Sequence, residues 1–334
     1  MLAVPGFVGN ALEPLIGVLG DTRRRRLLLA GGGVVLAIST ALSALATGFW
    51  PLLLALVLGN PAVTAFVSFS QAALMDREPS ARERNMARWT LAGSVGVVAG
   101  PVLLGAAVAL GAGWRGALLA LAAVTLPLTW AAARSVPRPQ SEGDLKGALR
   151  GVLEAVRRRE VLRWLALLAG SDLMLDVFHG FLALYLVDVG GLTPLEAALG
   201  VSVWAGAGLV GDALLLVVLR RVSGAAYLRA SAAVVTFVFP VFLVVDRLDV
   251  RLLLLGALGL LNSGWYAIPK AGLYSSLAER SGTAIAVGSL NGFAQALIPL
   301  ALGLLAQTFG LGAAMWLLLL SPLVLLVLAP RRSY

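Results

Sequence analysis

Long apolar segments that alternate with short charged connections are the feature that most limits how this chain can fold. A helix of about 20 residues crosses a hydrocarbon core of about 30 Å, and a backbone in lipid must satisfy its hydrogen bonds internally. The sequence therefore predicts an all-α, polytopic membrane protein with about eleven transmembrane helices. The expected spans are 2–20, 27–48, 51–75, 86–111, 114–134, 162–188, 193–219, 226–246, 251–277, 282–309 and 311–329.

Composition agrees with this class and excludes several others. Hydrophobic residues make up 59% of the 334 residues and charged residues 13%, about half the charged share of a soluble chain. The net charge of +9 lies in clusters between apolar runs, so we expect a lipid bilayer as partner and no nucleic acid. With no cysteine and one histidine we expect no metal and no cofactor. No nucleophile motif or GxxxxGK[ST] loop is present, so we expect neither an enzyme nor direct ATP drive.

Arginine is distributed unequally between alternate connections. One side of the predicted membrane carries only Arg115, Arg247 and Arg251, while nearly all other connections that bear arginine fall on the opposite side. The positive-inside rule then places the arginine-rich connections and the C-terminus in the cytoplasm. We therefore expect a multi-pass protein of the plasma membrane.

The longest polar break follows the fifth span. After the sequence VPRPQSEGD, apolar residues recur at helical spacing and predict an amphipathic helix on the cytoplasmic face, at Leu145, Leu149, Val152 and Val156. Two groups of membrane helices joined by a cytoplasmic linker are typical of a transporter built from repeats. We expect an N-terminal helix bundle of five spans, a linker and a C-terminal six-helix bundle, at 1–137, 138–161 and 162–334.

The turn after the first span, GVLGDTRRRR, resembles the loop between the second and third helices of the major facilitator superfamily. The matching positions are Gly17, Asp21, Arg25 and Arg26, whereas Thr22 and Arg24 depart from the pattern. The resemblance implies two bundles that work by alternating access. It also implies that Asp21 helps to latch a cytoplasmic gate by pairing with a cation near the end of a neighbouring helix, for which we expect Arg77. The alternative is that these arginines only anchor the topology.

A second resemblance lies in the fourth span. The sequence GSVGVVAGPVLLG is similar to a glycine-proline motif that marks drug/proton antiporters in the superfamily, with one extra residue between the proline and the last glycine. It favours efflux and a packed hinge between helices, although small-residue helix packing in general is the alternative. The hinge residues would be Gly96, Gly100, Pro101 and Gly105.

Both motifs come one helix earlier than in the family. We therefore expect that the first helix of the family is missing here and that the native start lies upstream of Met1. The family also places an arginine, associated with proton coupling, in the helix before the glycine-proline motif. No basic residue occurs between Pro51 and Met75, so the resemblance does not extend to that arginine.

Ionisable residues inside spans are costly in a bilayer and are therefore functional candidates. In the sixth span Asp172, Asp176 and His179 follow the spacing i, i+4 and i+7, which places them on one face of a regular helix. They could form a proton relay, since histidine exchanges protons near neutral pH. Alternatively, the two acids only line a wet cavity, and His179 lies near the outer interface.

The ninth span carries polar residues around the sequence YAIPK, where Pro269 predicts a kink. Lys270 either snorkels to the cytoplasmic side or faces a cavity, where it would attract an anionic group or a carboxylate. The candidates for substrate binding here are Asn262, Trp265, Tyr266 and Lys270.

Other polar residues complete the candidate set. Asn291 and Gln295, one turn apart, could bond either a substrate or a neighbouring helix, and Glu13 is a candidate cavity or coupling residue. Asp212, in a partial second copy of the arginine-rich motif, is expected to make a local helix contact.

The sequence thus predicts a secondary active transporter that exports a small organic compound, with protons as the suggested coupling ion. The alternative is a non-transporting membrane scaffold or sensor that retains the fold.

Overall fold

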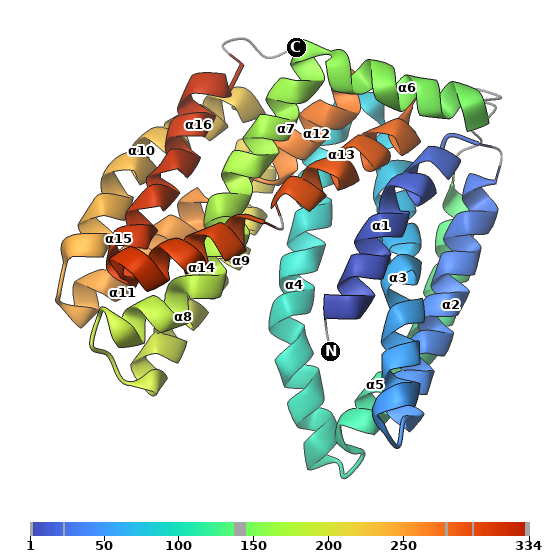
Figure 1. The fold of residues 1–334 in the computed structure, drawn as a ribbon, viewed down its shortest axis with the longest axis horizontal. Helices are drawn as coiled ribbons and strands as arrows, with labels where there is room; N and C mark the ends of the chain where they lie inside the picture. Colours follow the sequence, from blue (N-terminus) through green and yellow to red (C-terminus); the bar gives the residue numbers. More distant parts are fainter. Residues whose placement is uncertain (1–2, 23, 137–144, 278–279, 296, 331–334) are drawn as a thin grey trace. The chain divides into compact units, whose positions relative to one another are not determined.

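The computed structural model describes residues 3–22, 24–136, 145–277, 280–295 and 297–330 (Figure 1). Among these residues, eight helices are long and apolar enough to cross a membrane. Each expected span is present as one helix or as consecutive helices. The prediction of an all-α, polytopic membrane protein is confirmed.

The first five expected spans are continuous helices. The bounds are α1 (Ala3–Leu19), α2 (Arg25–Leu45), α3 (Phe49–Arg77), α4 (Arg82–Ala109) and α5 (Gly113–Ser135), with a 3₁₀ turn, η1 (Pro79–Ala81), before α4. The amphipathic helix predicted around Leu149 is present as α6 (Leu145–Arg157). It buries Val152 and Ala155 and leaves Leu149 exposed, so only part of its apolar stripe is covered.

The later spans are more often interrupted. The sixth consists of α7 (Arg159–Asp172), a π-helical turn η2 (Leu173–Val177) and α8 (Phe178–Asp188), and the next two are α9 (Pro194–Val218) and α10 (Gly224–Val244). The ninth divides into α11 (Leu248–Leu261) and α12 (Ala267–Ser276), and the tenth into α13 (Ser281–Gln295) and α14 (Ile298–Phe309). The last contains α15 (Leu311–Trp316), the 3₁₀ turn η3 (Leu317–Leu319) and α16 (Leu320–Leu328).

The chain divides into two compact units that exchange segments. Unit 1 contains Met1–Ala81, Val97–Val161 and Tyr274–Gly292, and unit 2 contains Arg82–Gly96, Leu162–Leu273 and Phe293–Tyr334. Most of α13 is therefore packed with the N-terminal helices, and the first half of α4 is packed with the C-terminal helices.

Unit 1 is held together by close helix packing at small residues. Helix α2 lies against both α3 and α5 (Figure 1). Gly33 of α2 faces Thr129 of α5, and Ser39 of α2 donates a 2.7 Å hydrogen bond to the carbonyl of Ala55 in α3. Small residues let membrane helices approach closely, and cross-helix hydroxyl bonds add to the packing energy.

Unit 2 is organised around buried aromatic rings. Phe178 of α8 lies edge-to-face with Phe239 and Phe242 of α10, with ring centroids 5.5 and 5.8 Å apart. The three side chains are fully buried. Tyr185 donates from its hydroxyl to the carbonyl of Leu243 at 2.9 Å, so the polar end of this buried ring is also satisfied.

Local sequence signals set several helix ends. Thr193 caps α9 and exchanges hydrogen bonds with Glu196, which forms a capping box, and Pro194 occupies the first helical position. Ser223 caps α10 through the amide of Ala226. Gly310, between α14 and α15, has a φ of +85°, a conformation that favours glycine.

The glycine-rich packing of α2 gives a direct test. A methyl group added at Gly33 would collide with the branched side chain of Thr129, whereas one added at Gly31 meets no atom within 4 Å. We predict that Gly33→Ala lowers the stability by about 1–3 kcal/mol through overpacking. Gly31→Ala should be neutral or stabilising by up to about 1 kcal/mol, because alanine is the better helix former. Tryptophan-fluorescence melting of the purified protein measures both, and equal melting temperatures would contradict the predicted packing.

Candidate functional site

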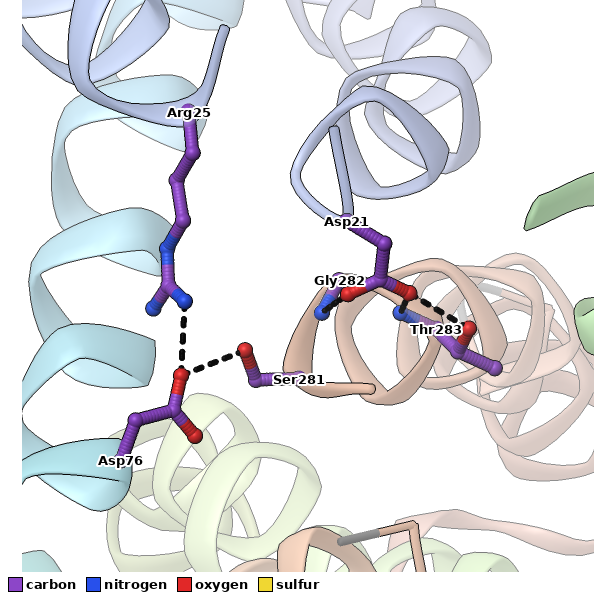
Figure 2. Close-up of polar contacts among 6 residues, drawn as sticks. All are labelled: Asp21, Arg25, Asp76, Ser281, Gly282 and Thr283. Atoms are coloured by element: carbon purple, nitrogen blue, oxygen red, sulfur yellow. Dashed lines mark hydrogen bonds and ion pairs between the residues drawn. The ribbon is translucent and has the colours of Figure 1, made fainter. Parts of the chain in front are cut away.

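The side chain of Asp21, in the turn after α1, accepts three hydrogen bonds from the first turn of α13 (Figure 2). One carboxylate oxygen accepts from the Gly282 amide at 2.6 Å, and the other accepts from the Thr283 amide at 2.8 Å and the Thr283 hydroxyl at 2.7 Å. The first amides of a helix have no partner within that helix. Asp21 supplies those partners from 261 residues away in the sequence, and we call this contact the Asp21 cap.

Two glycines allow the Asp21 cap to form. A Cβ atom on Gly17 would lie 2.5 Å from the backbone nitrogen of Ala286, and one on Gly282 would lie 2.5 Å from the carbonyl oxygen of Gly17. The end of α1 and the start of α13 therefore touch backbone to backbone. Gly17 lies one helical turn before Asp21, so the glycine provides the close approach and the acid provides the hydrogen bonds.

A second polar contact lies beside the Asp21 cap. Arg25, at the start of α2, forms an ion pair of 2.6 Å with Asp76, near the end of α3, and Ser281 donates to the same carboxylate at 2.8 Å (Figure 2). The Arg25 side chain is 5% exposed. Among the described residues its Nε and Nη2 atoms have no hydrogen-bond partner, so Asp76 is the main compensation for this buried charge.

The predicted pairing of Asp21 with Arg77 is wrong. Asp21 bonds to backbone amides at the positive end of a helix dipole, which takes the place of a cationic side chain. Arg77 and Arg26 are exposed, whereas the neighbouring Asp76 and Arg25 form the buried pair. The sequence analysis did not identify Asp76, Ser281, Gly282 or Thr283. The acid next to Arg77 was a visible signal for Asp76, but a backbone donor leaves no side-chain signature.

The Asp21 carboxyl group lies in the turn, outside the spans. Burial raises its pKa above the ordinary aspartate value, and the hydrogen bonds from Thr283 and Gly282 and the charge of Arg25 oppose that rise. The capped arrangement therefore binds this proton more tightly than an exposed aspartate would. The stability of the capped arrangement falls as the pH rises from the ordinary aspartate range through the raised pKa of Asp21.

Within their own unit, the glycines of the α4 motif make no close helix contact. Methyl groups added at Gly93, Gly96, Gly100 or Gly105 would meet no atom within 4 Å among the described residues. Large side chains beside them are exposed, and Val102 is 68% exposed. Pro101 lies inside a continuous α4. The packed hinge stays a prediction.

The expectation that Asp172, Asp176 and His179 share one regular helical face is wrong. A π-helical turn, Leu173–Val177, lies between α7 and α8 and widens the helix, so the i, i+4, i+7 register does not hold. Asp172 is half-buried, and Asp176 and His179 are exposed. Asp176 interacts electrostatically with His179, whose ring stacks on Trp204 of α9 with a centroid distance of 4.9 Å. The structure thus brings the second acid and the histidine together.

The ninth span is broken between α11 and α12, on the N-terminal side of Pro269. The turn Asn262–Tyr266 contains Gly264 with a φ of +80°. Asn262 is 3% exposed, and both polar atoms of its side-chain amide lack a hydrogen-bond partner within the described chain. Ser263 beside it donates to the carbonyl of Gly208 in α9 at 3.3 Å.

The remaining candidate residues of this span differ in burial and in contacts. Trp265 is fully buried and donates from its ring nitrogen to Ser231 at 2.9 Å, which makes it a packing residue in this structure. Lys270 is half-buried, with its ammonium nitrogen 6.0 Å from the ring centre of Tyr266, at the limit of a cation–π contact.

Glu13 is half-buried in α1 and takes part in neither contact. Asn291 and Gln295 lie in α13, but their side chains fall outside the described part of the structure.

The prediction of a local helix contact for Asp212 is wrong. This acid of α9 is 6% exposed and accepts a hydrogen bond of 2.6 Å from Ser94 of α4, 118 residues earlier in the sequence.

A cavity of about 500 Å³ lies among α2, α3 and α5 of unit 1. This volume is in the usual range for sites that bind small organic molecules. Its wall combines leucine side chains with polar groups, and the polar residues are Ser39, Thr40, Ser43, Asn60 and Trp114. Sequence patterns did not indicate these residues, because isolated hydroxyls are common in membrane helices.

The family model of the Major Facilitator Superfamily matches residues 1–293. The chain belongs to the major facilitator superfamily. No curated protein matches it.

Solved structures show the same fold. The E. coli fucose:proton symporter FucP is 15% identical, with a TM-score of 0.82, and the alignment covers 100% of this chain and 90% of FucP. A second FucP structure, in the outward conformation, is also 15% identical, with a TM-score of 0.81 and coverages of 100% and 89%. The human organic anion transporter MFSD10 (TETRAN) is 21% identical, with a TM-score of 0.77 and coverages of 98% and 83%. These likenesses confirm the transporter fold and the multi-pass membrane class.

Loss of the Asp21 cap should open the contact between α1 and α13. Asp21→Ala leaves the Gly282 and Thr283 amides without these partners, and losing a helix cap costs about 0.5–2 kcal/mol. The chain has no cysteine, so Ile285→Cys, at a buried position of α13, adds a unique reporter. We predict that maleimide labelling of this cysteine accelerates about 2- to 30-fold when Asp21→Ala is added. Asp249→Ala, at an exposed acid, is the control and should leave the rate unchanged. A rate insensitive to Asp21→Ala would contradict the role of the cap.

Loss of the buried ion pair should cost more than loss of an exposed one. Asp76→Asn leaves Arg25 buried without its anion, and we predict a loss of about 3 kcal/mol, the lower end for a broken buried pair, because Asp76 is 21% exposed. Asp249→Asn breaks the exposed pair with Arg247 and should leave the melting temperature nearly unchanged. The double variant Arg25→Leu/Asp76→Leu should recover most of the loss. Thermal melting compares the three, and equal losses for both single variants would argue against the buried pair.

Proposed function

We propose that this protein is a secondary active transporter that moves a small organic compound by alternating access, with the Asp21 cap as its cytoplasmic gate contact. The cap is the single observation that carries the proposal. It joins the end of α1 to the start of α13 through hydrogen bonds to one carboxylate, and it needs no cation. Losing a helix cap costs about 0.5–2 kcal/mol, a free energy small enough for a reversible contact.

The broken ninth span supports a substrate site in unit 2. Interrupted helices in transporters expose backbone and side-chain polar groups to substrate. Asn262 carries an amide with no partner among the described residues, and Ser263 and Tyr266 flank it in the same turn. Lys270, one turn further along α12, would attract an anionic group of the substrate. The cavity of about 500 Å³ in unit 1 provides a second site of suitable size.

Proton coupling is supported by the π-helical turn of the sixth span. Such turns occur frequently at functional sites, and this one holds Asp176 beside His179. An acid next to an imidazole can pass a proton near neutral pH. We assign Asp172 and Asp176 to proton binding, with His179 as their exchange partner.

Direction and location follow from the sequence motifs. The glycine-proline resemblance of α4 favours export by proton antiport. The arginine distribution favours the plasma membrane, with the C-terminus in the cytoplasm. A cytoplasmic position would place the Asp21 cap on the side from which an exporter loads.

Transport by purified protein in liposomes tests this function. The substrate panel contains fucose, an organic anion and a lipophilic cation, each measured with and without an imposed pH gradient. We predict gradient-driven movement of at least one compound, reduced about tenfold by Asp172→Asn or Asp176→Asn, in the range typical of coupling between two binding events. Asp188→Asn, an exposed acid at the end of α8, is the matched control. No movement of any compound or of protons would favour a scaffold or sensor. Unchanged pH dependence in both variants would overturn the assigned relay.

A further inference from the structure

Asp212 is a buried acid without a charged partner among the residues that the structure describes. Its side chain lies in α9, inside a helix long and apolar enough to cross a membrane, and is 6% exposed. Ser94 of α4 donates to it at 2.6 Å. Asp212 makes no ion pair with any described residue, in contrast to Asp76, which is paired with Arg25.

The groups around Asp212 are neutral. From α4 it receives the Ser94 hydroxyl, and on the side of α10 the titratable group that interacts with it is the phenol of Tyr227. Toward α11, Gly211 packs against the hydroxyl of Ser263, which bonds to backbone carbonyls. The cations nearest along α9, Arg220 and Arg221, lie beyond its end and are exposed. One hydroxyl donor is the visible compensation for a carboxylate charge at this position.

The free-energy cost of burying a charge then determines whether the Asp212 carboxyl group is ionised or protonated. An isolated carboxylate is expensive in an apolar setting, and such groups take up a proton rather than remain ionised. A protonated carboxyl group satisfies the same geometry, because its carbonyl oxygen can accept from Ser94 while its hydroxyl donates. The short contact across α4 and α9 therefore persists in the neutral form.

We propose that Asp212 is a proton-binding site, separate from the acids of the sixth span. The proton adds to a carboxylate oxygen on binding and leaves to water on release, with no other bond changed. The site joins the first half of α4 to α9, so its occupancy is sensed by both helices. Its use as a coupling site rests on the proposed transport function, whereas proton binding itself does not.

Infrared difference spectroscopy of the full chain in lipid nanodiscs tests the proposal. Spectra recorded across a pH titration report the carbonyl stretch of protonated carboxyl groups. We expect Asp212→Asn to remove one component of this signal, and Asp249→Asn, at an exposed acid, to retain it. Ser94→Ala should retain the component at a shifted frequency, because the band responds to the lost hydrogen bond. Asp212→Glu, which keeps an acid, should retain a component and guards against a variant that fails to fold.

The outcomes separate this proposal from the proposed function. Spectra of folded Asp212→Asn identical to wild type across the titration would overturn proton binding at Asp212. Loss of the component in Asp212→Asn alone would support proton binding at Asp212. This conclusion would hold even if the wild-type protein moved no compound in liposomes, because that result would overturn only the transport proposal. If wild type transports, unchanged pH dependence in Asp212→Asn would limit the site to proton binding and overturn its use in coupling.

Discussion

The first turn of α13 carries backbone amides that its own helix cannot satisfy, and the arrangement of unit 1 depends on how they are satisfied. Gly282 and Thr283 are buried, and buried amides need a hydrogen-bond partner. Asp21 meets that need from a distant part of the sequence. Burial raises the pKa of this carboxyl group, and the hydrogen bonds from Thr283 and Gly282 oppose that rise.

The start of α13 is also linked by polar contacts to the helices α2 and α3. Asp76 of α3 accepts from both Arg25 of α2 and Ser281 of α13, next to the residues that bond Asp21 (Figure 2). The acids, and not the arginines, therefore make the contacts to α13. Arg24 and Arg26 of this sequence are exposed, and there they can serve membrane topology. The two roles predicted for that motif, a latch and a topology anchor, apply to different residues of the same turn.

The sequence predicts the spans well because the cost of exposing polar groups to lipid leaves long apolar runs wherever a helix crosses. It indicates Gly17 and Asp21 because the turn that holds them resembles a loop of the major facilitator superfamily. It fails at the partner of Asp21, since a backbone amide has no residue identity. It also fails at Asp172, Asp176 and His179, because a single π-helical turn changes the register that the spacing assumes. Asp212 was misjudged because its partner, Ser94, is an ordinary residue brought near by the fold.

The break between α11 and α12 shows where a membrane helix can lose backbone hydrogen bonds. Interrupting a helix frees backbone groups that lipid cannot satisfy, so breaks persist only where protein or a polar cavity surrounds them. Ser263 donates to the Gly208 and Gly259 carbonyls, and Trp265 donates to Ser231, so these two side chains of the turn stabilise their surroundings. Asn262 differs, because its buried amide makes no such bond among the described residues. A purely structural break would favour an apolar residue there, since burying an unpaired amide costs free energy. The asparagine is therefore better explained by a polar ligand than by packing, and it is the strongest candidate in the turn for contact with a transported compound.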